Sequence, residues 1–126
     1  MPRVIHFEIH ADNPQRAILF YAEVFGWKFT KWQGQMDYWV IQTMPSNRPG
    51  INGGLTKREF PGQPINVGIA VPSVGDYLAR IEARGGKTVV GATELPDKTR
   101  FAVCQDSEGN ALVIVETKEE KPYSSE

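Results

Sequence analysis

The chain opens with a stretch in which every second residue is apolar. Between residues 4 and 10 this two-residue period is typical of a strand with one buried face. An apolar stripe with helical spacing follows, made up of Ala17, Ile18, Tyr21, Val24 and Phe25. We expect Asp12 or Asn13 to cap this helix, Pro14 to lie in its first turn, and Gly26 to end it in a left-handed conformation.

Short apolar runs separated by loop-forming residues predict three more strands in the first half of the chain, at about 27–33, 37–43 and 51–57. The second half then repeats the first. A shift of 60 positions aligns the two halves without a gap through about 24 residues.

In this second copy the pattern predicts a strand at 65–71 and a helix that begins at a capping box. Ser73 and Asp76 form that box, and Gly85–Gly86 ends the helix. The remaining predicted strands lie at about 87–94, 100–105 and 111–117, and a turn at 106–109 joins the last two as a hairpin.

The repeat predicts an α+β fold of two tandem βαβββ modules. Each module has one apolar sheet face that it cannot bury alone, so the two are expected to form one compact domain. The predicted parts are a first module at 1–58, a linker at 59–64, a second module at 65–117 and a polar tail at 118–126.

Composition excludes several classes of function. The net charge of −1 and the pI of about 6.1 give no electrostatic reason to expect binding to nucleic acid or to an anionic membrane. No apolar run approaches the roughly 20 residues that span a bilayer, and the first residues do not form a signal peptide. Because the single cysteine, Cys104, fits a reducing compartment, we expect a cytoplasmic protein.

Four segments carry a resemblance to a known family: His6, the stretch 13–27 with its Phe20-Tyr21 and Phe25-Gly26-Trp27 motifs, the stretch 50–55, and the turn 106–110. Over about residues 4–117 the chain resembles the vicinal oxygen chelate superfamily. That superfamily includes glyoxalase I, extradiol dioxygenases and the bleomycin- and fosfomycin-resistance proteins. The chain looks most like the glyoxalase-related branch, whose activity is unknown.

The resemblance implies that each module curls its sheet around a cavity, with the helices outside. It also implies metal ligands on the first and last strand of each module, which fall here on His6, Gly54, Asn66 and Val113. Only His6 is a good ligand, because glycine and valine carry no donor and a neutral amide binds transition metals poorly. We therefore expect no metal cofactor, with a divalent metal ion on rearranged ligands as the alternative.

His6, Glu8 and His10 share one face of the first strand, and they are the strongest chemical signal in the chain. Same-face neighbours lie ~6.6 Å apart, so two of them can lean together but three form a poor metal sphere. We predict Glu8 and His6 as acid and base. The alternative is an ordinary solvated sheet face.

If His6 faces the cavity, alternation along the strands assigns the other walls. His10 also lies where glyoxalase I-like enzymes place a substrate-binding side chain, as the resemblance implies. The predicted ligand-binding residues are His10, Asn52, Thr56, Asn66, Phe101, Val103 and Val113.

Trp32, Tyr38 and Trp39 are interpreted first as sheet packing and second as a surface on which a flat ligand or a partner subunit could stack. Cys104 alternates onto the helix side and is interpreted as a small core residue.

Three functions remain open. The first is a metal-independent, glyoxalase-related lyase or isomerase that binds a small organic molecule and transfers a proton on it. The second is a non-catalytic, drug-sequestering binder, and the third is a metal-dependent lyase or dioxygenase with rearranged ligands. For all three we expect a homodimer, as the resemblance implies.

Overall fold

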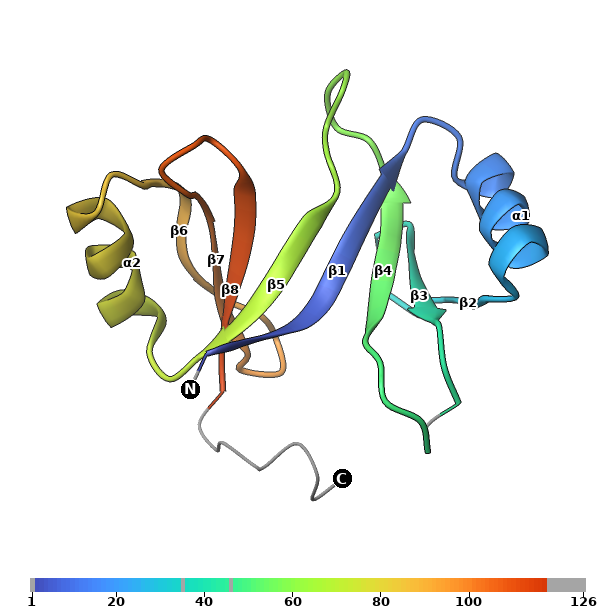
Figure 1. Cartoon of the computed structure of the whole chain (residues 1–126), viewed down its shortest axis with the longest axis horizontal. Coiled ribbons are helices and arrows are strands. Elements are labelled where there is room, and N and C mark those ends of the chain that lie inside the picture. The colour runs from blue at the N-terminus through green and yellow to red at the C-terminus, as the bar shows by residue number, and fades with distance from the viewer. Residues whose placement is uncertain (1, 35, 46, 118–126) are drawn as a thin grey trace. The chain divides into compact units, whose positions relative to one another are not determined.

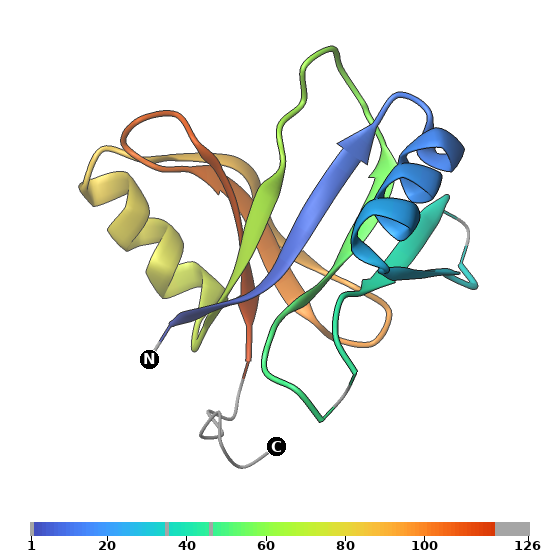
Figure 2. The same ribbon diagram turned by 45° about the vertical axis from the view of Figure 1, so that its right-hand side comes forward.

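The computed structural model describes residues 2–34, 36–45 and 47–117 of the chain, so the predicted polar tail lies outside the described residues. It divides into two compact units (Figures 1 and 2). The first unit is Ile5–Asn66, and the second is Met1–Val4 together with Val67–Glu126. The predicted α+β class is confirmed, because the element order β-α-β-β-β occurs twice.

The first unit contains five elements: β1 (Arg3–Ala11, of which Ile5 onward belongs here), α1 (Pro14–Phe25), β2 (Lys28–Lys31), β3 (Tyr38–Gln42) and β4 (Asn52–Lys57). Its strands follow the order β2-β3-β4-β1. β1 and β4 run parallel, and β3 runs antiparallel to both β2 and β4. In this order β4 lies between β1 and β3, which matters for the site described below.

The second unit repeats this arrangement with β5 (Asn66–Val71, of which Val67 onward belongs here), α2 (Val74–Ala83), β6 (Lys87–Glu94), β7 (Arg100–Gln105) and β8 (Ala111–Glu116). Its strands follow the order β5-β8-β7-β6, with β5 and β8 parallel and the other pairs antiparallel. The predicted turn at 106–109 closes the β7–β8 hairpin, where the Asp106 carboxylate accepts the backbone N–H groups of Glu108 and Asn110.

Both helices begin and end where local chemistry predicts. Asn13 caps α1 by accepting the N–H of Arg16, which decides between the two predicted caps. Gly26 follows α1 with a φ of 77°, a left-handed conformation that favours glycine. Ser73 caps α2 by accepting the N–H of Asp76, as predicted.

Each unit has its own core between its helix and one face of its strands (Figure 1). In the first unit the buried residues are Ile9, Ile41 and Leu55, and Ala17, Ile18 and Tyr21 of α1 pack against them. In the second unit the buried residues are Val71, Val74, Ala102, Cys104 and Ile114. Cys104 is therefore a core residue, as predicted.

The prediction that the apolar stripe of the first helix is buried along its whole length is wrong for the last turn. Val24 and Phe25 are 57% and 58% exposed, although both were expected to be buried. The reason is that Trp27, just beyond the helix, takes the place of that turn against the core. Its ring stacks on Tyr21 at 5.3 Å with an interplanar angle of 2°. Phe25 lies against both rings, 6.2 Å from Tyr21 and 5.4 Å from Trp27, and stays largely exposed.

Neither helix in the described part of the chain is long and apolar enough to cross a membrane.

Candidate functional site

The predicted acid–base pair comes together on β1. Nε2 of His6 lies 2.7 Å from Oε2 of Glu8, so these same-face neighbours lean toward each other as their spacing allows. Their side chains are 34% and 20% exposed, respectively. An ionised carboxylate only accepts hydrogen bonds, so the contact requires a proton on Nε2 of His6.

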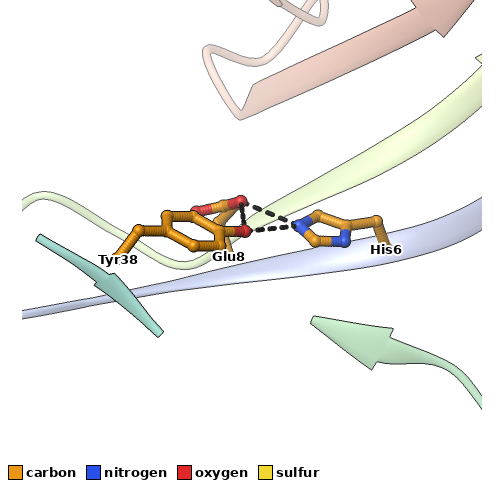
Figure 3. Close-up of polar contacts among 3 residues, drawn as sticks. All are labelled: His6, Glu8 and Tyr38. Carbon is orange, nitrogen blue, oxygen red and sulfur yellow. Dashed lines mark hydrogen bonds and ion pairs between the residues drawn. The ribbon is translucent and has the colours of Figure 1, made fainter. Parts of the chain in front are cut away.

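Tyr38 of β3 completes the cluster, and its hydroxyl group donates to Oε2 of Glu8 over 2.7 Å. The same hydroxyl oxygen lies 3.3 Å from Nε2 of His6, so the three polar groups form a closed triangle (Figure 3). All three residues belong to the first unit, and we refer to them below as the Glu8 cluster.

Tyr38 reaches Glu8 across β4, and it can do so because Gly54 has no side chain. Gly54 is the register partner of Glu8 on β4, where the tyrosine ring passes over the strand. A Cβ atom added at Gly54 would overlap the Tyr38 hydroxyl group. The glycine is thus a steric requirement of the cluster and not of a turn.

The electrostatics of the cluster keep Tyr38 neutral. Burial raises the pKa of Tyr38 well above its usual range, and the negative charge of Glu8 and their hydrogen bond raise this pKa further. The phenol is therefore a stable donor at neutral pH. Both hydrogen bonds to Glu8 use Oε2, which leaves Oε1 without a partner among the described residues.

His10, the second histidine, does not join the cluster. Its ring is 8% exposed, and Nδ1 donates to the carbonyl oxygen of Pro64 over 2.8 Å. His10 also lines an open pocket of about 370 Å³ at the end of β1, together with Arg16, Phe20 and Arg58. None of the three cluster residues lines this pocket.

Two other predicted ligand-binding residues of the first unit bond to neighbouring backbone. Oδ1 of Asn52 accepts the N–H of Thr43 over 2.9 Å, and the hydroxyl group of Thr56 donates to the carbonyl oxygen of Asp37 over 2.9 Å. Both remain on the predicted face, because Asn52 is the register partner of His6. They support the segments on either side of β3, from which Tyr38 projects.

The side-chain oxygen of Asn66 is buried and unpaired within the described part of the chain. This atom, Oδ1, is shielded from solvent and has no hydrogen-bond partner among the described residues. Such an acceptor is expected to find a water molecule or a ligand donor.

The remaining predicted ligand-binding residues, Phe101, Val103 and Val113, lie in the second unit. Val103 and Val113 are register partners, so the two share the face opposite the core residues Ala102 and Cys104. The alternation that assigned them to one wall is therefore observed, and their contact with a ligand stays a prediction.

The residues present do not fit the metal ion that the resemblance implies. No group of three or more His, Cys, Asp or Glu side chains that could hold a metal ion occurs within residues 2–34, 36–45 and 47–117. Gly54 and Val113 carry no donor atom, and Nε2 of His6 is engaged by Glu8. We therefore derive no chemistry through a metal.

Sequence reasoning missed Tyr38 as a member of the site and favoured packing for it. Only the pairing of β1, β4 and β3 shows that a tyrosine at this position reaches Glu8. A signal was present in the glycine at position 54, which leaves room beside a carboxylate once the register is known.

A family model for the Glyoxalase/Bleomycin resistance protein/Dioxygenase superfamily matches residues 3–114. No curated protein sequence matches the chain.

Several solved structures share the fold. A glyoxalase/bleomycin resistance protein/dioxygenase superfamily member from Vibrio splendidus 12B01 is 15% identical with a TM-score of 0.66, and the match covers 93% of this chain and all of that one. Methylmalonyl-CoA epimerase from Mycobacterium tuberculosis is 14% identical with a TM-score of 0.66, and the match covers 97% of this chain and 90% of that one.

The Mn(II)-bound glyoxalase from Novosphingobium aromaticivorans is 18% identical with a TM-score of 0.62. That match covers 97% of this chain and 40% of the longer glyoxalase. At these identities the structural likeness shows the fold alone. Because the family model spans nearly the whole described chain, the protein belongs to the glyoxalase/bleomycin resistance protein/dioxygenase superfamily.

Proposed function

We propose that the protein binds a small organic molecule with a carbonyl group and transfers a proton at the carbon beside that group, without a metal ion. The observation that carries this proposal is the convergence of Glu8, His6 and Tyr38, with donor–acceptor distances of 2.7, 2.7 and 3.3 Å. Proton transfer at carbon requires a base that takes the proton and hydrogen-bond donors that stabilise the enolate oxygen, and a carboxylate beside two donors can supply both.

The proposed reaction begins with Glu8. Oε1 takes a proton from the C–H bond, and the electrons of that bond move onto the carbonyl oxygen to form an enolate. Glu8 is then neutral, so Tyr38 and His6 no longer face a charged carboxylate. Their N–H and O–H groups become free to donate to the enolate oxygen. Glu8 then gives its proton back to the carbon and becomes a carboxylate again. Return to the face that lost the proton restores the starting compound, and delivery to the opposite face, after the enolate has turned in the site, gives its epimer.

The high pKa of Tyr38 suits this role. The phenol keeps its proton throughout neutral pH, so it acts as a hydrogen-bond donor and not as the base. Burial also strengthens a hydrogen bond to a developing oxyanion, because little solvent competes for it.

The comparisons are consistent with this choice. One structural neighbour is named a methylmalonyl-CoA epimerase, and another is named a glyoxalase. An isomerase-type or lyase-type reaction of a small molecule is therefore a reasonable expectation for this fold. The proposal also includes the predicted ligand contacts of His10, Asn52, Thr56, Asn66, Phe101, Val103 and Val113, and a cytoplasmic homodimer.

A second candidate is a binder that sequesters a flat compound without turnover. Trp32 favours it, because its ring is 49% exposed and lies edge-on to Tyr38 at 6.3 Å. An exposed indole beside the cluster is a suitable stacking surface for an aromatic ligand.

The decisive experiment is exchange of carbon-bound hydrogen in deuterated water. A panel of 2-oxo acids, β-keto esters and malonyl-type thioesters is incubated with the protein, and loss of the C–H signal is followed by proton NMR. We expect exchange above the buffer rate for at least one compound, and a loss of about 10²–10⁴-fold with Glu8→Gln. Glu23→Gln, an exposed helix position, is the matched control.

Exchange that persists in Glu8→Gln would contradict the role of Glu8. If a compound quenches the fluorescence of Trp32 on binding and shows no exchange, the binder is the correct function.

A further inference from the structure

The side chain of Tyr38 and any side chain at position 54 would occupy the same space on one face of the strands of the first unit. The Tyr38 hydroxyl group occupies the space that a side chain at Gly54 would enter. We propose that Tyr38 is a positioning residue that locks the His6–Glu8 pair, and that by filling the space over Gly54 it keeps this pair free of divalent metal ions. The inference concerns the residues of the proposed function, but its tests do not require turnover.

The lock follows from the hydrogen bonds. Oε2 of Glu8 accepts from Tyr38 and from His6, each over 2.7 Å, so the carboxylate is held in one orientation from two strands. A charge-assisted hydrogen bond of this length is stronger than a neutral one. Without the phenol, only the neighbouring histidine on the same strand would orient Glu8.

The same bonds engage two of the donor atoms that a metal ion could use, Nε2 of His6 and Oε2 of Glu8. A metal ligand must offer a lone pair, but Nε2 of His6 carries the proton that it gives to Glu8. The Tyr38 hydroxyl group uses its proton in the hydrogen bond that it donates to Oε2 of Glu8. Within the cluster, only oxygens of Glu8 remain as anionic donors.

Position 54 is where a third ligand would have to stand. It is the register partner of Glu8 on a parallel strand, and paired strands lie ~4.8 Å apart. A glutamate there would join His6 and Glu8 in a compact set of one nitrogen and two carboxylate donors, which divalent metals accept. The tyrosine-locked arrangement and this ligand set exclude each other sterically.

The first test observes the lock directly by NMR of the two histidine rings. Tyr38→Phe keeps the ring over Gly54 and removes only the hydroxyl group. We expect the imidazole ¹⁵N and ¹H resonances of His6 to move, whereas those of His10, bonded to Pro64, stay in place. Gly54→Ala should reproduce the shift of His6 by displacing the intact hydroxyl group. Unchanged His6 resonances in both variants would overturn the positioning role.

The second test asks whether removing the tyrosine and adding a carboxylate creates a metal site. Wild-type protein and the variant Tyr38→Ala/Gly54→Glu are loaded with Mn²⁺, Ni²⁺ or Zn²⁺, desalted and analysed for metal content and thermal unfolding. We expect no retained ion and no shift in wild type. The double variant should retain about one ion per chain and unfold several degrees higher with metal. Gly75→Glu, in open space on α2, controls for the added charge.

An ion retained by wild type and lost on His6→Ala would overturn the proposal, as would a folded double variant that retains none. If the double variant does not fold, the single variant Tyr38→Ala is tested in the same way, by its thermal unfolding with and without metal. It frees the His6–Glu8 pair, so metal should stabilise it more than wild type, and an equal response would overturn the proposal. A different outcome would refute only the proposed function. In that outcome wild-type protein exchanges no carbon-bound hydrogen, while the His6 resonances still move in Tyr38→Phe.

Discussion

The hydroxyl oxygen of Tyr38 lies 2.7 Å from Oε2 of Glu8, although β3 and β1 are not neighbours in their sheet. β4 separates the two strands, and the tyrosine ring passes over it at Gly54. A contact between residues 30 positions apart thus depends on a residue that has no side chain.

The first prediction concerns the ionisation of Tyr38. Glu8→Gln removes the charge that raises the pKa of Tyr38, so this pKa should fall. It should still lie above the ordinary value of about 10, because burial is the larger cause. Tyrosinate absorbance in an alkaline titration measures the change, and Tyr38→Phe identifies the share of the signal that belongs to Tyr38.

The raised pKa of Tyr38 also fixes the sign of a stability change. Above pH ~10 the unfolded chain loses the Tyr38 proton while the folded protein keeps it, so the free energy of unfolding falls as the pH rises. Below that pH the contribution is fully present. Urea titrations between pH 8 and pH 11 should show a smaller fall for Tyr38→Phe, and equal falls would contradict the raised pKa.

The second prediction is a contrast between two glycines. Gly54→Ala should lower the free energy of unfolding by about 1–3 kcal/mol, because the new methyl group displaces the Tyr38 hydroxyl. Gly75→Ala, on α2 with nothing within 4 Å of the new methyl, should raise it by about 0.5 kcal/mol. Urea unfolding measures both changes.

The loss in Gly54→Ala should shrink when Tyr38 is alanine, because the clash is then absent. A double-mutant cycle over positions 38 and 54 tests this directly. An equal loss in both backgrounds would show that another neighbour, and not Tyr38, requires the glycine.

The third prediction concerns a long-range cap of α2. Oε1 of Glu116, at the end of β8, accepts the N–H of Val74 over 2.9 Å. Glu116→Ala should lower the free energy of unfolding by about 1–2 kcal/mol, because a backbone donor at the helix start loses its acceptor. Glu116→Gln keeps an acceptor and should lose less. Glu94→Ala, at an exposed strand position, should change it by less than about 0.5 kcal/mol.

The fourth prediction concerns Cys104, whose side chain is fully buried in the second core. Burial raises the pKa of the Cys104 thiol, so little reactive thiolate exists at neutral pH. Ellman's reagent should label the native protein slowly and the urea-unfolded protein at once, as absorbance of the released thiolate would show. Rapid labelling of native protein would mean that this core opens readily.

Much of the fold could be predicted from the sequence, because the signals involved are local. Alternation at 4–10 predicts β1, and the caps at Asn13 and Ser73 satisfy backbone groups within three residues of themselves. Gly26 supplies a backbone conformation that other residues rarely adopt. The repeat then determines the element order, since the same local signals occur twice.

The site could be predicted only in part. His6 and Glu8 are two residues apart on one strand face, so alternation brings them within reach of each other, and the structure shows that they bond. His10 has the same spacing from Glu8, yet its ring bonds to Pro64, 54 positions away, and periodicity contains no information about that partner.

The sequence by itself determined the α+β class, the duplicated element order and the strand face that His6 and Glu8 share, because each depends on residues close together in the chain. Only the tertiary structure decided that Tyr38 joins this pair and that Glu116 caps α2. Both contacts depend on strand order and register, which arise from the packing of segments far apart in sequence. The reason for a glycine at position 54, which is the space that Tyr38 needs, can be seen only when the strands on either side of it are known.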